Sequence, residues 1–261
     1  MSVTLKFSDY GLDDFRGIAA NFGHETYAYA VTPNVDHIIR YHDQPAFRDL
    51  YESAKFVLLD SRFLAGLLRL TRGLNLRCCP GSDLTATLFA DVIAPDDKVV
   101  LIGSTSAAVA LLTEKYGVRG LRHFNPPMGF IKDPAAVEQC LRFIESESPF
   151  RFCLLAVGSP QQEMLAHALL ARGRARGLAL CIGASIDFLT GNEKRAPRWM
   201  QNAGLEWAYR LLQNPMRLAR RYLIRGPRIF LMLPKLRIQI LPDAHASLDP
   251  ALKPAPELPP G

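Results

Sequence analysis

The sequence predicts an α/β fold with a mostly parallel sheet and helices on both of its faces. Three observations support this prediction. Short apolar runs of strand length recur along the chain, and segments with helical periodicity separate them. Small, polar or helix-capping residues follow the runs, and 261 residues suffice for one large α/β domain or a smaller domain with an appendage. Such an alternation is typical of parallel sheets buried on both faces.

The elements are expected in the following order. Strands are expected at residues 27–32, 55–60, 98–104, 121–124, 151–159 and 178–185. Helices are expected at residues 35–53, 61–72, 83–94, 106–117, 134–147 and 161–176. The strands are followed by the loop sequences TPN, DS, GSTS, GSP and GAS. Because parallel strands end at one edge of a sheet, these loops should converge on one ligand-binding crevice.

The polar residues of these loops allow two interpretations. Asn34, Asp60, Ser104 and Ser159 are each plausible helix N-caps, whose side-chain oxygens would accept from free backbone N–H groups. Several Gly-Ser loops at one edge favour phosphate binding by backbone N–H groups instead. The glycine fingerprint of dinucleotide-binding enzymes and the P-loop lysine are both absent from the sequence, which argues against a nicotinamide-dependent enzyme and an ATPase.

Positive charge is concentrated near the C-terminus. Residues 194–237 contain eleven Lys or Arg and one acid, which gives +10, whereas the other 217 residues carry −4. Arginines alternate there with tryptophan, tyrosine and leucine at helical spacing, and three prolines divide the segment into short helices. We therefore expect an α/β domain at 1–195, a basic helical appendage at 196–241 and a Pro-rich disordered tail at 242–261.

The composition of the appendage favours an anionic membrane surface as its partner. Its aliphatic residues would enter the headgroup region while its arginines meet lipid phosphates. Nucleic acid would explain the arginines alone, and a solvated charged face is the third interpretation. The longest apolar run there, IFLML at 229–233, is too short to span a bilayer. The acidic N-terminal residues are unlike a secretory signal, so we expect a cytoplasmic protein, peripheral on the inner face of the cell membrane.

Several motifs, in their order along the chain, resemble the WecG/TagA/CpsF glycosyltransferases. They are TPNVD at 32–36, LLD at 58–60, GSDL at 81–84, GSPQQE at 158–163 and the long stretch from GASIDF to RRYL at 183–223. The resemblance implies a Rossmann-like domain and an inverting transfer from a UDP-sugar to a saccharide on a polyprenyl diphosphate. It also implies catalysis without a metal ion or another cofactor, and an appendage that touches the membrane and helps to close the active site.

The resemblance also assigns roles to individual residues. Asp60 matches the general base, and Thr32 and Asn34 match the loop that faces it. The donor and acceptor pocket is expected to include Gly103, Ser104, Gly158, Gln162, Glu163 and Asp187. Arg210, Arg217 and Arg220 match appendage arginines that approach the diphosphate. The chain has Cys78 where the family often has arginine, and whether the neighbouring Arg77 replaces it is open.

One alternative of a different class stays open at this point. A non-catalytic module that binds a membrane or nucleic acid would also be basic, but it would leave the strand-end loops without a purpose. The donor sugar, the acceptor saccharide, the linkage position and the oligomeric state are not determined by the sequence, and a homo-oligomer is left open.

Overall fold

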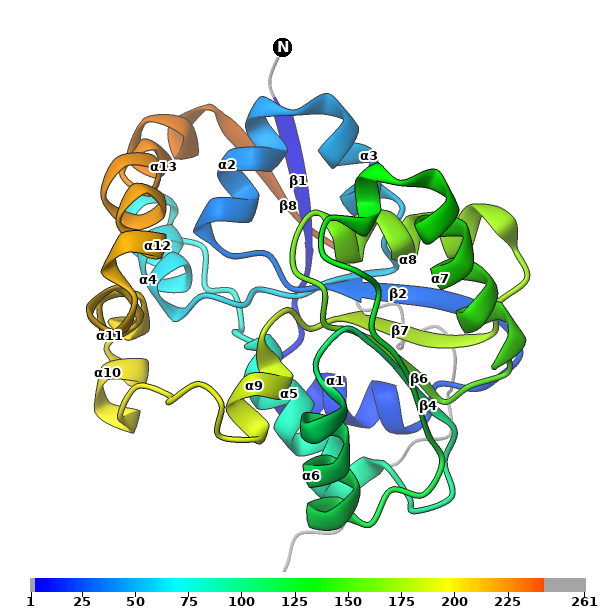
Figure 1. The fold of residues 1–261 in the computed structure, drawn as a ribbon. Coiled ribbons are helices and arrows are strands. Elements are labelled where there is room, and N and C mark those ends of the chain that lie inside the picture. The colour runs from blue at the N-terminus through cyan, green and yellow to red at the C-terminus, as the bar shows by residue number, and fades with distance from the viewer. Residues whose placement is uncertain (1–2, 242–261) are drawn as a thin grey trace, which may run out of the picture.

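The computed structural model describes residues 3–241, and within them six parallel strands form the central sheet (Figure 1). The strands are β2 (Tyr27–Val31), β3 (Phe56–Val57), β4 (Val99–Ile102), β5 (Leu121–Phe124), β6 (Phe152–Leu155) and β7 (Gly177–Cys181). Their order across the sheet is β3-β2-β7-β6-β4-β5, and every pairing is parallel. The predicted parallel sheet is therefore confirmed. Every strand except β5 is shorter than the apolar run from which it was predicted.

Helices cover both faces of this sheet (Figure 1). One face carries α2 (Val35–Asp43), α3 (Pro45–Glu52), α7 (Pro134–Ser146) and α8 (Gln161–Arg172). The other carries α1 (Leu12–Ala20), α5 (Gly81–Thr87), α6 (Ser106–Tyr116) and α9 (Ser185–Leu189). Alternate residues of β2 separate the two cores, since Tyr29 belongs to one buried cluster and Ala28 and Ala30 to the other.

Two predicted helices differ in detail from the observed ones. The segment 35–53 is divided into α2 and α3, because Pro45 has no N–H to donate and begins a new helix instead. The segment 83–94 begins earlier, at Gly81, and its second half is a π-helical turn at Leu88–Val92. Neither difference changes which strand ends meet.

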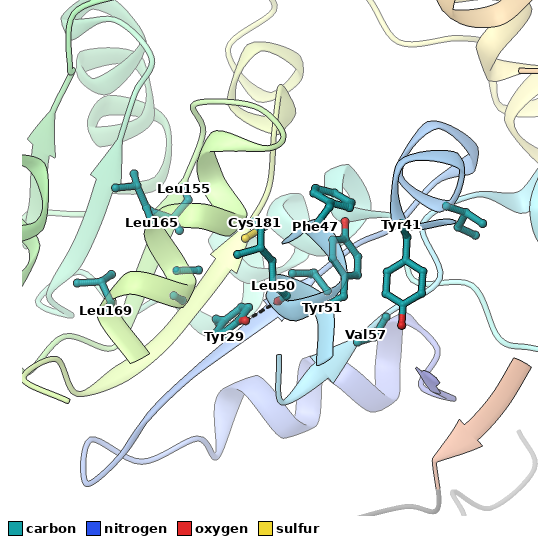
Figure 2. Packing of buried hydrophobic residues seen from close by; sticks show 14 of the residues in the cluster. Tyr29, Tyr41, Phe47, Leu50, Tyr51, Val57, Leu155, Leu165, Leu169 and Cys181 are labelled. Atoms are coloured by element: carbon teal, nitrogen blue, oxygen red, sulfur yellow. Dashed lines mark hydrogen bonds between the residues drawn. The ribbon is translucent and has the colours of Figure 1, made fainter. Parts of the chain in front are cut away.

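Aromatic packing fixes α2 and α3 on the sheet, as Figure 2 shows. Phe47 and Tyr51 of α3 lie with their ring centroids 4.9 Å apart, and Tyr41 of α2 packs edge-on against Tyr51. The hydroxyl of Tyr29 on β2 donates to the carbonyl of Leu50. This packing places the start of α2 beside the carboxyl ends of β2 and β3.

The appendage is helical over most of its length and forms a column beside α2 and α4 (Arg62–Arg72) (Figure 1). It consists of α10 (Arg198–Asn202), α11 (Glu206–Gln213), α12 (Pro215–Ala219), a π-helical turn (Arg220–Arg225), α13 (Arg228–Met232) and a 3-10 turn (Leu233–Lys235). No helix in residues 3–241 combines the length and apolar character needed to cross a bilayer. The tail predicted at 242–261 lies outside the described residues.

A second, two-stranded sheet joins the appendage to the start of the chain. β8 (Leu236–Leu241) pairs in parallel with β1 (Val3–Ser8), in register from Val3 opposite Leu236 to Ser8 opposite Leu241. We predicted neither strand. Arg72 at the end of α4 also donates to the carbonyl oxygens of Leu233 and Leu236. The appendage is therefore held at its far end as well as through the chain that leaves α9.

Candidate active site

A cavity of about 770 Å³ lies at the carboxyl ends of β2, β3, β6 and β7, and residues of the appendage close its other side. This is the edge at which the loops were predicted to converge. The predicted site residues that line the cavity are Thr32, Asn34, Asp60, Gly158, Gln162, Asp187, Arg210 and Arg217. Gly103, Ser104, Glu163 and Arg220 do not line it.

Asp60 is not the cap of the helix that follows it. Ser61 is the N-cap of α4, because its hydroxyl accepts from the N–H of Leu64 at 3.2 Å. The Asp60 Oδ1 atom instead accepts from the N–H of Gly81 at 2.7 Å, and the carboxylate lines the cavity. Of the two interpretations of this residue, the capping role therefore belongs to its neighbour.

The surroundings of Asp60 act on its affinity for protons in both directions. Burial raises the pKa of this carboxyl group, and the negative charge of Glu206 adds to the increase. The N–H of Gly81 and the charge of Arg210 lower the pKa and oppose the effect of burial. The net pKa lies above the ordinary aspartate value, so the ionised group is a stronger proton acceptor than a solvated carboxylate.

A close approach explains the glycine beside Asp60. A Cβ atom at Gly81 would lie 3.1 Å from the hydroxyl oxygen of Thr32 and 3.7 Å from Asp60 Oδ1. The Thr32 hydroxyl itself donates to the carbonyl of Cys181 at 3.3 Å. Thr32, Asp60 and the start of α5 thus form one wall of the cavity.

His37 organises the turn that carries Asn34, and sequence analysis did not identify it. The N–H of Asn34 donates to His37 Nδ1 at 3.3 Å, and Asn34 Oδ1 accepts from the N–H of Asp36 at 3.1 Å, which caps α2. Burial, together with the positive charge of Arg221, lowers the pKa of His37 to about 3. The imidazole is therefore neutral at pH 7 and accepts this hydrogen bond.

Gln162 and Glu163 have different roles in the wall formed by α8. The Gln162 side chain lines the cavity, accepts from the N–H of Gly183 at 2.9 Å and donates to Glu163 Oε1 at 3.0 Å. Glu163 is fully buried beneath it, and burial raises the pKa of this carboxyl group. We predicted Glu163 as a substrate-binding residue, but in the structure it orients the amide of Gln162 and does not face the cavity.

Three other predicted residues lie outside the lining. Gly103 follows β4 with φ of 90°, and a Cβ atom there would come within 2.9 Å of Val157, so this glycine permits the loops after β4 and β6 to approach each other. Ser104 follows with φ of 70° and a buried hydroxyl. Arg220 is exposed, whereas Arg221 lines the cavity.

Arg77 does not replace the arginine that the resemblance leads one to expect at position 78. Its guanidinium pairs with Asp14 at 2.7 Å and with Asp9, and its side chain is about half exposed outside the cavity. Arg62 in the first turn of α4 lines the cavity instead, where it pairs with Asp83 at 3.0 Å. Arg62 was not among the predicted site residues, although it lies only two residues after the candidate base Asp60.

Four of the cavity-lining arginines form two pairs, and each pair shares one acid. Asp36 lies between Arg40 of α2, at 3.4 Å, and Arg221 of the appendage, at 3.7 Å. Glu193 lies between Arg217 at 3.0 Å and Arg210 at 3.7 Å. All six side chains line the cavity. In each group, two guanidinium groups and one carboxylate give a net charge of +1. In residues 3–241, no group of three or more His, Cys, Asp or Glu side chains is arranged to hold a metal ion.

The chain is similar to known proteins over most of its length. A family model described as "Glycosyl transferase WecG/TagA/CpsF family" matches residues 6–241. A protein of Bacillus spizizenii is 27% identical over 226 residues, which cover 85% of this chain and 82% of that protein. It is named N-acetylglucosaminyldiphosphoundecaprenol N-acetyl-beta-D-mannosaminyltransferase. The match includes the central sheet, the loops around the cavity and the appendage.

Proposed function

Because this chain belongs to the WecG/TagA/CpsF family of glycosyltransferases, we propose that it transfers a sugar from a UDP-sugar to a saccharide carried on a polyprenyl diphosphate, with inversion at the anomeric carbon. The name of the relative from Bacillus spizizenii supports a lipid-diphosphate acceptor and a hexosamine donor. The single observation that carries the proposal is the carboxylate of Asp60, which the N–H of Gly81 orients within a cavity lined by arginines.

Inverting transfer requires one base near the nucleophile. The acceptor hydroxyl attacks the anomeric carbon, and its proton passes to the Asp60 carboxylate as the new C–O bond forms. The bond from the anomeric carbon to the diphosphate oxygen breaks on the opposite face, and UDP leaves with the electron pair. The hydrogen bond from Gly81 orients Asp60 for this step. The raised pKa of Asp60 strengthens it as a base.

The departing diphosphate requires positive charge. The cavity supplies guanidinium groups in two pairs, Arg40 with Arg221 and Arg210 with Arg217, and guanidinium groups bind phosphate oxygens through paired N–H donors. Thr32 and Asn34 line the cavity beside Asp60. Gln162 and Gly158 line it at the start of α8. We propose that the saccharide rings occupy the space between these two walls, with Asp187 beside them.

We expect the purified protein to transfer labelled N-acetylmannosamine from its UDP derivative to N-acetylglucosaminyl-diphosphoryl-polyprenol. UDP-glucose and UDP-N-acetylmannosaminuronic acid complete the donor panel. Product formation is measured by chromatography of the lipid fraction, and the anomeric configuration of the product is determined by NMR. If no donor yields product while the protein binds vesicles, the non-catalytic alternative is favoured over transfer.

We further propose that the appendage binds the inner face of the cell membrane. Five aliphatic side chains of its helices are more than half exposed and form what we call the appendage apolar surface: Leu212, Met216, Leu223, Ile224 and Leu231. Exposed arginines, among them Arg220 and Arg225, lie in the same segment. Aliphatic residues with neighbouring arginines suit an anionic lipid surface, which would also bring a lipid-linked acceptor to the cavity.

Replacing both Leu223 and Ile224 by serine is expected to weaken vesicle binding by about 10- to 100-fold. The double variant lacks the two aliphatic side chains that would pass from water into the headgroup region. Binding is measured by sedimentation with phosphatidylglycerol vesicles. A matched control replaces Leu111 and Met128, which are exposed outside the appendage, with serine. Equal loss of binding in both double variants, or none in the first, would contradict this membrane assignment.

A further inference from the structure

Arg40 belongs to α2, outside the appendage, and is held in place at the edge of the cavity. Its Nη1 atom donates to the hydroxyl of Ser159 at 3.2 Å, and its Nη2 atom pairs with Asp36 Oδ2 at 3.4 Å. The guanidinium lies over the ring of Phe47, 5.2 Å from its centroid, and the side chain is 18% exposed. An arginine fixed on three sides presents its remaining N–H groups to the cavity with little loss of side-chain entropy on binding.

Arg221 approaches the same acid from the appendage. Its Nη2 atom donates to Asn34 Oδ1 at 3.3 Å, while its Nε atom is 3.7 Å from Asp36 Oδ2, too far for a hydrogen bond. This Nε atom is buried and has no hydrogen-bond partner in the part of the chain that the structure describes. Because this Nε atom faces the Asp36 carboxylate and is closed to the cavity, a ligand would contact the terminal nitrogens of Arg221, whose side chain is 32% exposed and lines the cavity.

The charge around Asp36 also favours an anion. Two guanidinium groups face one carboxylate, and His37 adds no charge because burial lowers its pKa to about 3. Glu163 acts on Arg40 from beneath the cavity, but burial raises the pKa of Glu163 and so favours its uncharged form. The N-termini of α2 and α8 contribute further positive potential at Asn34 and Ser159.

The Asp36 pair is separate from the pair on Glu193. Arg40 and Arg221 share no acid with Arg210 and Arg217, and each pair lines the cavity. The proposed reaction involves two diphosphates, one on the donor and one on the lipid acceptor. We propose that Arg40 and Arg221 bind a phosphoryl group of one substrate diphosphate, while Arg210 and Arg217 serve the other. This inference rests on the proposed function.

The role assigned to Asp36 separates this proposal from a structural explanation. If Arg40 binds a phosphoryl group, Asp36 competes with the ligand for the two guanidinium groups. Removing the carboxylate then strengthens anion binding, whereas removing the guanidinium weakens it. If the Asp36 to Arg40 ion pair only stabilises α2, removal of either partner has the same effect on binding.

The test measures binding of UDP and of farnesyl diphosphate by calorimetry to Arg40→Gln, Arg40→Lys and Asp36→Asn. Arg40→Gln is expected to raise the Kd for one of the two probes by about 10- to 100-fold. Arg40→Lys should fall between this variant and the wild type, because it keeps the charge without the planar fork. Asp36→Asn should lower the Kd for the same probe. An effect on UDP identifies the donor diphosphate, and an effect on farnesyl diphosphate identifies that of the acceptor.

Arg142→Gln is the matched control, since Arg142 pairs with Glu138 four residues earlier at 2.7 Å, outside the cavity. Its Kd values should equal those of the wild type, and thermal melting checks that each variant is folded. Wild-type affinity in folded Arg40→Gln, or equal weakening by Arg40→Gln and Asp36→Asn, would overturn the inference. A wild type that transfers no sugar but binds a probe in an Arg40-dependent way would overturn the proposed function and leave this site standing.

Discussion

Replacing Asp60 with asparagine is expected to lower the rate of sugar transfer by about 10²- to 10⁴-fold, the usual contribution of a positioned base. Asparagine keeps the shape of the side chain and an oxygen that accepts from the N–H of Gly81, so the thermal melting temperature should change little. It cannot take the proton of the acceptor hydroxyl. The measurement is initial-rate transfer of labelled sugar with both substrates saturating.

The pH dependence adds a second readout. Burial raises the pKa of Asp60, so the carboxyl group becomes protonated at a higher pH than an ordinary aspartate, whose pKa is about 3.9. As the pH is lowered, the wild-type rate should therefore begin to decrease above that value. This acid limb should be absent from the residual activity of Asp60→Asn. Asp96→Asn makes the same chemical change at an exposed residue outside the cavity and should leave the rate unchanged. Turnover by Asp60→Asn within twofold of the wild type would remove the proposed role.

The central sheet could be predicted because its strands are buried on both faces. Residues 99–102 and 152–155 are wholly buried and therefore form continuous apolar runs in the sequence. β1 and β8 were not predicted although both alternate apolar and polar residues, a pattern typical of half-exposed strands. Each is completed by a partner at the opposite end of the described chain, and no local pattern indicates that pairing.

The strand-end part of the site followed from topology, and the helical part did not. Thr32, Asp60 and Gly158 come together because parallel strands end at one edge. Asp36 and Arg40, four residues apart, have the spacing of an ion pair on a solvated helix, and only the appendage that packs over α2 makes them part of a cavity.

No local signal in the sequence separates Arg221 from Arg220. They lie four and three residues after Arg217, and both spacings occur on one helical face. Pro215 begins a new helix after α11, so the periodicity of Arg210 does not extend to either of them. The resemblance to a family directed attention to Arg220, and only the packing of the appendage places Arg221 in the cavity.

The appendage contributes to the cavity only while it stays docked, and β8 is the part that holds its far end. Six residues of β8 pair with β1, and Arg72 donates to the carbonyl groups of Leu236, the first residue of β8, and of Leu233 in the preceding 3-10 turn. Inward of this attachment, α13 contributes Ile229 and Met232 to the main core. The cavity-lining arginines of the appendage therefore depend on a sheet that lies outside the cavity.

A chain that ends after Lys235 is expected to lose at least about 100-fold in transfer rate, because Arg210, Arg217 and Arg221 are no longer held against the rest of the cavity wall. Trypsin should also cleave the segment 198–232 faster, which reports undocking independently of activity. The matched control ends after Leu241, keeps β8 and should transfer sugar at the wild-type rate. If the shorter chain does not fold, Arg72→Met removes the bonds to Leu233 and Leu236 and should show the same changes to a smaller degree. Equal transfer rates and equal cleavage in the two truncated chains would show that β8 does not hold the appendage.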